Sequence, residues 1–312
     1  MIKIDLVTGF LGSGKTTFIK LYAKYLIQKG YKIGIIENDY GAVNVDMMLL
    51  QDALDNQCDL EMISGGSDKQ THQRRLKTKL IAMGMLGYDR IIIEPSGIYD
   101  VDEFFDTLYE EPLNNWYEVG SVITIIDAKL DYHLSKQSQY IFASEIASAG
   151  KIVLSKTQDV SKEKVNHLLN YINQSLKAIQ CHRQITDEFI DKNWNDFTED
   201  DYELILTSGY IPENYQKLSF NDIYSTLYFM NINITQDQLY NVLKNIFEDN
   251  ECGKIFRIKG FIHKDNEEWL EVNATKKEIS MKPIHQGQEV IIVIGENLVK
   301  DKIEEYINER RK

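Results

Sequence analysis

The chain has 312 residues, of which 43% are hydrophobic and 27% are charged, a composition typical of a globular protein long enough for two domains. Its net charge of −13 argues against a general nucleic-acid surface or an anionic-membrane surface, because phosphate groups would be repelled. The three cysteines lie far apart, so the sequence offers neither a disulfide framework nor a paired-cysteine metal motif. We expect no signal peptide and no transmembrane helix, and hence a cytoplasmic protein.

The first motif in chain order is a glycine-rich turn between a strand and a helix. Residues 2–7 predict a strand, and the apolar spacing from Phe18 to Leu26 predicts a helix that stops at Gly30. Between them, residues 9–17 read Gly-Phe-Leu-Gly-Ser-Gly-Lys-Thr-Thr. This stretch contains the pattern G-x-x-x-x-G-K-T, which in such a context is a P-loop.

The residue types of this turn suit a polyphosphate. Backbone N–H groups can surround a phosphate only where no Cβ intervenes, which requires Gly12 and Gly14. Lys15 would add a positive charge at the β- and γ-phosphates, and the Thr16 hydroxyl is a hard oxygen ligand for Mg²⁺. We therefore predict a nucleotide-phosphate site formed by Gly12, Ser13, Gly14, Lys15, Thr16 and Thr17.

Polar residues follow the next two long apolar segments. Glu37 and Asp39 come after the strand predicted at 31–36, and Glu94 and Gly97 come after three consecutive isoleucines. In an open α/β sheet, ligands bind at the carboxyl ends of the strands. We expect Glu37 or Asp39 to position an attacking water, and Glu94 to hold a water on Mg²⁺. Gly97 would bring its backbone close to the γ-phosphate. The alternatives are a polar loop before a helix and an ordinary Pro-Ser-Gly turn.

The rest of the chain predicts an α/β fold followed by a smaller α+β domain. Strands at 60–63, 121–126 and 151–154 alternate with helices at 43–54, 69–85, 135–148 and 161–179, which predicts a doubly wound, mostly parallel sheet. From 180 to 221 the periodicity is lost, and we place the domain boundary at Pro212, between residues 1–212 and 213–312. The second domain is predicted to contain helices at 236–247 and 298–310 and strands at 254–263, 267–273, 277–282 and 289–294.

Several of these segments together resemble the CobW-like family of P-loop GTPases, relatives of the HypB and UreG metallochaperones. The segments that carry the resemblance are residues 9–17, 37–41 with Asp46, 92–97, 125–128, 153–157 and 257–261. They cover nearly the whole chain in the right order. The resemblance implies that the chain binds GTP, with ATP as the alternative, and hydrolyses it slowly with Mg²⁺. It also implies a switch that assists a metalloenzyme or a cofactor-handling protein.

The chain departs from this family at its metal motif. By position, Gly66, Asp68 and Lys69 stand where the family's Cys-x-Cys-Cys has its thiolates. Hard oxygen donors and a cation cannot form a soft sulfur site for Zn²⁺. If this chain handles a metal, we expect Asp68 and Glu37 near it, with oxygen or nitrogen donors and without thiol-selective zinc uptake.

A second departure concerns recognition of the base. The resemblance implies that Ser155, Lys156 and Gln158 correspond to a motif whose final aspartate accepts two hydrogen bonds from guanine. Gln158 has one acceptor oxygen and a donor amide, so it cannot replace that carboxylate. Losing a charged partner weakens binding by about 1.5–3 kcal/mol, or about ten- to a hundredfold. The adjacent Asp159 is expected to point elsewhere.

Two other functions stay open at this level. One is a small-molecule kinase on the same P-loop, for which Arg74 and Arg75 would have to serve as lid residues, although the spacing predicts that they face water. The other is a degenerate binding module that works through its C-terminal domain. The sequence leaves the oligomeric state open, with a homodimer as one alternative.

Overall fold

The computed structural model describes residues 1–38, 50, 58–63, 69–97, 101–218, 224–232, 234–264, 268–285 and 287–308. The chain divides into two compact units, residues 1–219 and 220–312. Except for Leu50, the helix predicted at 43–54 lies outside the described residues. Across the described ranges, every helix is too short or too polar to pass through a lipid bilayer.

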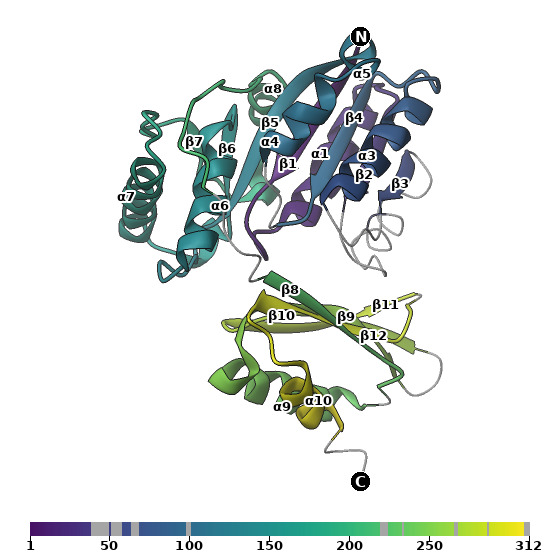
Figure 1. Ribbon diagram of the computed structural model, residues 1–312, viewed down its shortest axis with the longest axis vertical. Coiled ribbons are helices and arrows are strands. Elements are labelled where there is room, and N and C mark those ends of the chain that lie inside the picture. Colours follow the sequence, from purple (N-terminus) through teal and green to yellow (C-terminus); the bar gives the residue numbers. More distant parts are fainter. Residues whose placement is uncertain are drawn as a thin grey trace. The chain divides into compact units, whose positions relative to one another are not determined.

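The first unit contains a sheet of seven parallel strands in the order β3-β2-β4-β1-β5-β6-β7 (Figure 1). Its strands are β1 (Ile2–Thr8), β2 (Ile33–Asn38), β3 (Asp59–Ile63), β4 (Arg90–Pro95), β5 (Tyr117–Asp127), β6 (Lys151–Ser155) and β7 (Phe189–Ile190). Its α-helices are α1 (Lys15–Gln28), α3 (Lys69–Met83), α4 (Val101–Leu108), α5 (Leu113–Trp116), α6 (Lys136–Ala147), α7 (Lys162–Ala178) and α8 (Glu199–Leu206). The predicted α/β fold with a doubly wound parallel sheet is confirmed.

The isoleucines of β4 explain why this strand is central. Ile91 and Ile93 belong to a core cluster that also contains side chains of α3 and α4. Ile92 points into a second cluster, which contains side chains of α1. Because successive side chains of a strand point to opposite faces, a parallel strand covered by helices on both faces is apolar throughout.

A buried carboxylate connects the strands around the P-loop. Asp5 of β1 accepts hydrogen bonds from the Tyr22 hydroxyl (2.9 Å) and from the backbone N–H of Ser121 (2.8 Å), and it forms an ion pair with Arg90. Burial raises the pKa of Asp5, and this effect exceeds the lowering by Arg90 and the hydrogen bonds. The network links β1 to α1, β4 and β5, so it fixes the strand that leads into the glycine-rich turn.

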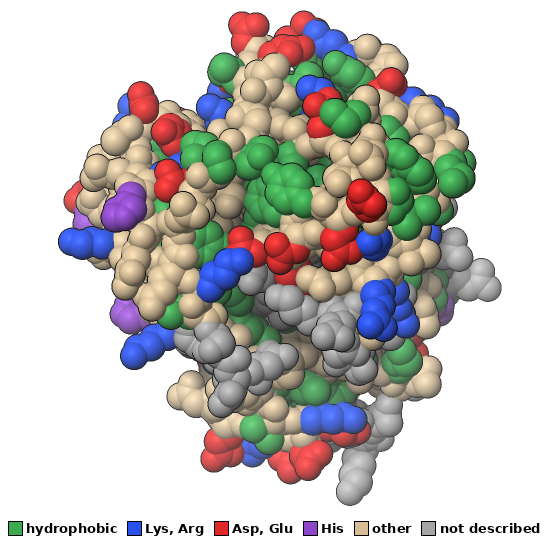
Figure 2. Space-filling view, turned by 45° about the horizontal axis from the view of Figure 1, so that its top comes forward, with side chains coloured by type: hydrophobic (Ala, Val, Ile, Leu, Met, Phe, Trp, Pro, Cys, Tyr) green, Lys and Arg blue, Asp and Glu red, His purple; other side chains and the backbone are tan. Residues whose placement is uncertain are grey.

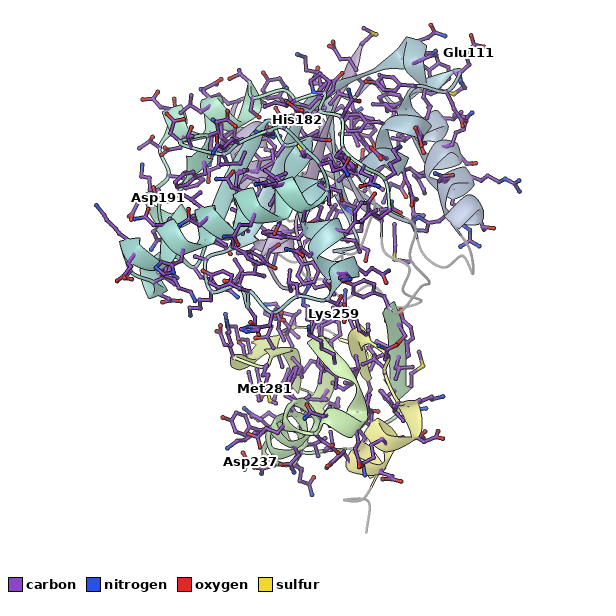
Figure 3. All side chains as sticks on the ribbon, turned by 60° about the vertical axis from the view of Figure 1, so that its left-hand side comes forward. Glu111, His182, Asp191, Asp237, Lys259 and Met281 are labelled. Atoms are coloured by element: carbon purple, nitrogen blue, oxygen red, sulfur yellow. The ribbon has the colours of Figure 1, made fainter. Side chains whose placement is uncertain are left out.

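The second unit contains a five-stranded antiparallel sheet in the order β11-β10-β9-β12-β8. Its strands are β8 (Tyr224–Met230), β9 (Lys254–Lys264), β10 (Glu268–Thr275), β11 (Glu278–Ile284) and β12 (Val290–Glu296), and its α-helices are α9 (Gln236–Glu248) and α10 (Lys300–Asn308). Side chains of both helices share one core cluster with the sheet. Figure 3 labels Lys259 in β9, Met281 in β11 and Asp237 in the first turn of α9. The predicted small α+β unit is therefore present.

The sequence prediction lacks α4, α5, β7, α8 and β8. Two of these show why. α8 lies in the stretch predicted to be irregular. It gives a weak helical pattern because it has only eight residues, of which Ile205 and Leu206 are buried, and because its first turn is acidic. Thr198 caps it with a capping box. β8 lies at the edge of its sheet, where a strand needs no continuous apolar pattern, and it pairs with β12 alone among the described strands.

The surface agrees with the charge balance of the sequence. On the face drawn in Figure 2, Lys and Arg side chains are interspersed with acidic ones instead of forming one extended basic area. On α3, Lys77 pairs with Glu110 and Lys79 pairs with Glu61, each at 2.6 Å, and Arg74 and Arg75 are exposed. The basic stretch of this helix is thus a solvated, partly paired face.

Candidate functional site

The glycine-rich turn joins β1 to α1 through three glycines with positive φ. These angles are +145° at Gly9, +76° at Gly12 and +100° at Gly14. A Cβ at Gly9 would lie 2.2 Å from the carbonyl oxygen of Ile125, so no other residue fits there without movement of the backbone. Gly14 is the N-cap of α1, and its carbonyl accepts the N–H of Phe18 (3.0 Å). The turn has the curled backbone from which successive N–H groups can face one anion.

Two P-loop side chains, those of Lys15 and Thr16, are buried and hydrogen-bonded, whereas Thr17 is exposed. Lys15 is 6% exposed, and its Nζ donates to the carbonyl oxygen of Gly9 (2.8 Å). The Thr16 hydroxyl donates to Oε1 of Glu94 (2.9 Å), which lies at the end of β4. The Ser13 hydroxyl is buried and finds no hydrogen-bond partner in the part of the chain that the structure describes. A buried polar atom in that state is available to an incoming ligand.

The carboxyl ends of β2 and β4 lie beside this turn. Glu37 and Glu94 are register partners on these neighbouring strands, and both are buried. Asn38 is 0% exposed, and neither atom of its amide has a hydrogen-bond partner within the described ranges. A Cβ at Gly97 would lie 2.8 Å from the backbone nitrogen of Leu11, so the chain leaving β4 packs directly on the P-loop. Asp39, the second predicted water-positioning residue, lies outside the described residues.

The predicted base-recognition loop follows β6. Lys156 adopts a left-handed conformation (φ +57°), and its Nζ is 2.7 Å from a carboxylate oxygen of Asp127 at the end of β5. Ser155 is buried, whereas Gln158 is exposed. Asp159 pairs with Lys129 at 2.7 Å. This ion pair supports the expectation that Asp159 does not replace the carboxylate missing at Gln158.

Trp194 is a residue of this region that sequence reasoning missed. The edge of its ring packs close to Gly14: a Cβ added to that glycine would lie 3.2 Å from the ring. The same added atom would lie 3.8 Å from the Cβ of Ser155. The indole N–H donates to the carbonyl oxygen of Leu154 (2.9 Å), and the ring meets Phe18 edge-on. Trp194 therefore lines the edge of the P-loop that faces the base-recognition loop. The only signal in the sequence is an aromatic residue in an otherwise polar loop.

Glu145 is the second missed residue. It lies in α6, is 0% exposed, and its Oε1 accepts hydrogen bonds from the Thr8 hydroxyl (2.9 Å) and the Gly9 N–H (3.3 Å). Burial raises the pKa of Glu145 to about 8, while Lys15 and the two hydrogen bonds act in the opposite direction. A single acidic residue between Phe142 and Ile146, on a helix otherwise buried in the core, is the signal that could have identified it.

In the described ranges, the P-loop region included, no group of three or more His, Cys, Asp and Glu side chains has an arrangement that could hold a metal ion. Burial raises the pKa values of Cys58 and Cys252 to about 11, so both remain thiols near neutral pH. Asp68, expected beside any bound metal, lies outside the described residues, as does Gly66.

Both units match models of known protein families. Residues 3–187 match the model described as "CobW/HypB/UreG, nucleotide-binding domain", and residues 226–310 match "Cobalamin synthesis protein cobW C-terminal domain".

Individual proteins are similar over much of the chain. The zinc chaperone YjiA of Escherichia coli is 28% identical over 276 residues, which are 85% of this chain and 83% of the relative. The zinc-regulated GTPase metalloprotein activator 1 of Schizosaccharomyces pombe is 22% identical over 234 residues, and the match covers 70% of this chain but about half (52%) of the relative. The crystal structure of Zn(II)-bound YjiA GTPase from E. coli aligns over 100% of this chain and 99% of its own, with 22% identity and a TM-score of 0.40.

Replacement of Gln158 by Asp is expected to strengthen GTP binding by about ten- to a hundredfold, because a carboxylate accepts two charge-assisted hydrogen bonds from guanine. ATP binding should stay unchanged, since adenine offers no matching pair of donors. Calorimetric titration of each Mg²⁺-nucleotide measures both affinities. Gln158→Asn is the matched control, with the shape of Asp but no charge. An equal gain for GTP and ATP would contradict the assignment of this position.

Trp194 should report on nucleotide binding. The chain has three tryptophans. Trp194 is the one beside the P-loop, since its ring edge would lie 3.2 Å from a Cβ added to Gly14. Addition of Mg²⁺-nucleotide is therefore expected to change the intrinsic fluorescence. The change should disappear in Trp194→Phe and persist in Trp116→Phe and Trp269→Phe. A signal that survives in Trp194→Phe would place the nucleotide away from this edge of the turn.

Proposed function

The chain belongs to the CobW/HypB/UreG family of nucleotide-binding proteins, and on that premise we propose that it binds GTP, with ATP as the alternative, and hydrolyses it slowly with Mg²⁺. One observation carries the proposal: the side chains of Lys15, Thr16 and Glu94 are buried together at the glycine-rich turn, where α1 begins, and Thr16 is hydrogen-bonded to Glu94. A positive side chain, bare N–H groups and a helix N-terminus together favour a polyphosphate.

Lys15 and the turn bind the phosphates. In this structure Lys15 Nζ is bonded to the Gly9 carbonyl, and it exchanges that oxygen for a phosphate oxygen when the nucleotide enters. Its charge then opposes the negative charge that develops on the transferring phosphoryl group. The backbone N–H groups from Gly12 to Thr17 would surround the phosphates, and that of Ser13, which donates to the carbonyl oxygen of Phe10 (3.1 Å) in this structure, would change partner. Gly97 packs on Leu11, and we expect its loop to respond to the γ-phosphate.

The oxygen donors present fit Mg²⁺. Thr16 Oγ1 and Glu94 Oε1 are hard oxygens 2.9 Å apart in a buried position, and these two residues would hold the ion, Glu94 through water. Bound there, Mg²⁺ supplies charge neutralisation for the β- and γ-phosphates. Glu37, buried on the strand beside Glu94, is the residue proposed to orient the attacking water, and Asp39 shares this role on sequence grounds.

The client proposed for this switch is a metalloenzyme or a cofactor-handling protein. Support comes from the relatives, of which one is named a zinc chaperone and another a metalloprotein activator. The cysteines do not fit a thiolate zinc site, since the three of them lie far apart in the sequence and the described residues contain no group of three or more metal-ligating side chains. A metal passed on by this chain would therefore be bound by oxygen or nitrogen donors, with Glu37 and Asp68 as candidates.

The kinase alternative gains no support, because Arg74 and Arg75 are exposed on α3. The binding-module alternative differs from the proposal in one measurable quantity, the turnover of nucleotide.

Lys15→Ala is expected to lower kcat/KM for GTP hydrolysis by about a hundredfold or more, because it removes a buried charge aimed at the reacting phosphate. Phosphate release from the purified chain, with GTP and with ATP, measures this. Lys24→Ala is the control, since Lys24 is an exposed lysine on the same helix. Turnover that is equal in Lys15→Ala and wild type would contradict the proposal. Tight nucleotide binding without turnover would favour the binding module instead.

Cobalt titration is expected to give no sulfur-to-metal charge-transfer absorption, because the three cysteines lie far apart in the sequence and the described residues hold no group of three or more metal-ligating side chains. A triple variant, Gly66→Cys with Asp68→Cys and Lys69→Cys, places thiols where the resembling family has them and should gain that absorption. Tight stoichiometric Zn²⁺ in the wild type that is lost on Cys58→Ser would contradict the expectation.

A further inference from the structure

The Glu145 carboxyl lies behind the P-loop, and the reaction proposed above does not use it. It is 0% exposed and accepts hydrogen bonds from Thr8, the last residue of β1, and from Gly9, the first residue of the turn. The surrounding α6 residues Phe142, Ala143, Ile146 and Ala147 are buried and apolar. A carboxyl placed among such residues lowers stability unless a charge or hydrogen bonds compensate it.

Gly9 connects this carboxyl to the P-loop lysine. The N–H of Gly9 donates to Glu145, and the carbonyl oxygen of the same residue accepts Lys15 Nζ at 2.8 Å. The backbone of Gly9 also packs closely on the Ile125 carbonyl, where a Cβ would not fit. The Glu145 carboxyl and the resting Lys15 ammonium are thus linked through the N–H and the carbonyl of one residue.

We propose that Glu145 is a positioning residue for Lys15, which holds the lysine in its resting place through Gly9 and sets by its own charge how tightly a nucleotide's phosphates bind. This inference rests on the proposed function, because it requires a nucleotide at the P-loop. When ionised, Glu145 attracts the Lys15 ammonium away from the phosphates and repels the phosphates themselves. When protonated, it does neither.

The groups around Glu145 leave Lys15 as the charge that acts on it. Among the described charged side chains, Lys15 is the one whose charge acts on the pKa of Glu145, which it lowers. β1 contributes the neutral Thr8, the turn contributes Gly9, and β5 contributes Thr124, whose hydroxyl donates to the Glu145 backbone carbonyl. The α7 contact to α6 between Ser175 and Gln139 is neutral. Arg183 donates to carbonyl oxygens at the end of α6 and pairs with Glu188.

The direction of the pH effect follows from this arrangement. The pKa of Glu145 is raised to about 8, so the carboxyl is mostly protonated near neutral pH and mostly ionised a unit above its pKa. A bound phosphate disfavours the ionised form and raises the pKa further. Nucleotide binding therefore takes up protons, and affinity falls as pH rises through the pKa of Glu145.

The experiment is calorimetric titration of the full chain with Mg²⁺ and GDP from about pH 7 to about pH 9, a range above the titration of the terminal phosphate. Two buffers with different ionisation enthalpies give the number of protons taken up. In the wild type, Kd should rise by about two- to fivefold across the range, with net proton uptake near the midpoint. Glu145→Gln keeps an acceptor for Thr8 and Gly9 but cannot ionise, so it should lose both the pH dependence and the uptake. Glu188→Gln, which removes a carboxylate paired with Arg183, should keep both.

The outcomes separate this inference from the proposed function. Binding in Glu145→Gln with the wild-type pH dependence would overturn the role of Glu145 and leave the nucleotide site intact. Failure of the wild type to bind any Mg²⁺-nucleotide would overturn the proposed function. If Glu145→Gln does not fold, the wild type still decides the question, because binding without proton uptake would overturn the inference.

Discussion

The tight backbone packing at Gly9 is the constraint on which the site depends. Its φ of +145° starts the turn, and the carbonyl oxygen of Ile125 in β5 occupies the space that a side chain would need. The two polar groups of this residue are bonded to Glu145 and Lys15, one on each side. The glycine pattern is local in sequence, but its position is fixed by residues more than a hundred positions away, as in the Gly9–Glu145 contact with a separation of 136.

The strand order then determines which side chains meet the turn. β2, β4 and β1 are adjacent, so the ends that carry Glu37 and Glu94 lie next to the strand that leads into the P-loop. Asp5, in the middle of β1, fixes this strand against β4 and β5 through Arg90 and Ser121. Buried charges therefore lie along β1 as well as at the turn that follows it, the first stabilising the fold and the second forming the candidate site.

Much of this could be predicted from sequence, because the signals are local. Three consecutive isoleucines require a strand covered on both faces, and the glycine and lysine spacing of residues 9–17 requires a strand before it and a helix after it. Glu145 and Trp194 could not be assigned in the same way, since α6 and the loop after β7 meet the P-loop only in the folded chain. α8 and β8 were missed for another reason, which is that a short helix with an acidic first turn and an edge strand carry little periodicity.

The two ends of the candidate site differ in how deeply their side chains are buried. At the phosphate end, Lys15, Thr16, Glu94 and Glu145 are buried, and interactions between charges are strong where water is excluded. At the predicted base end, Gln158 is exposed, and the carboxylate next to it in sequence, Asp159, is paired with Lys129. In the proposed nucleotide complex, the difference between the two ends is therefore one of charge: the phosphates would meet buried Lys15, whereas the base would meet a neutral amide at position 158.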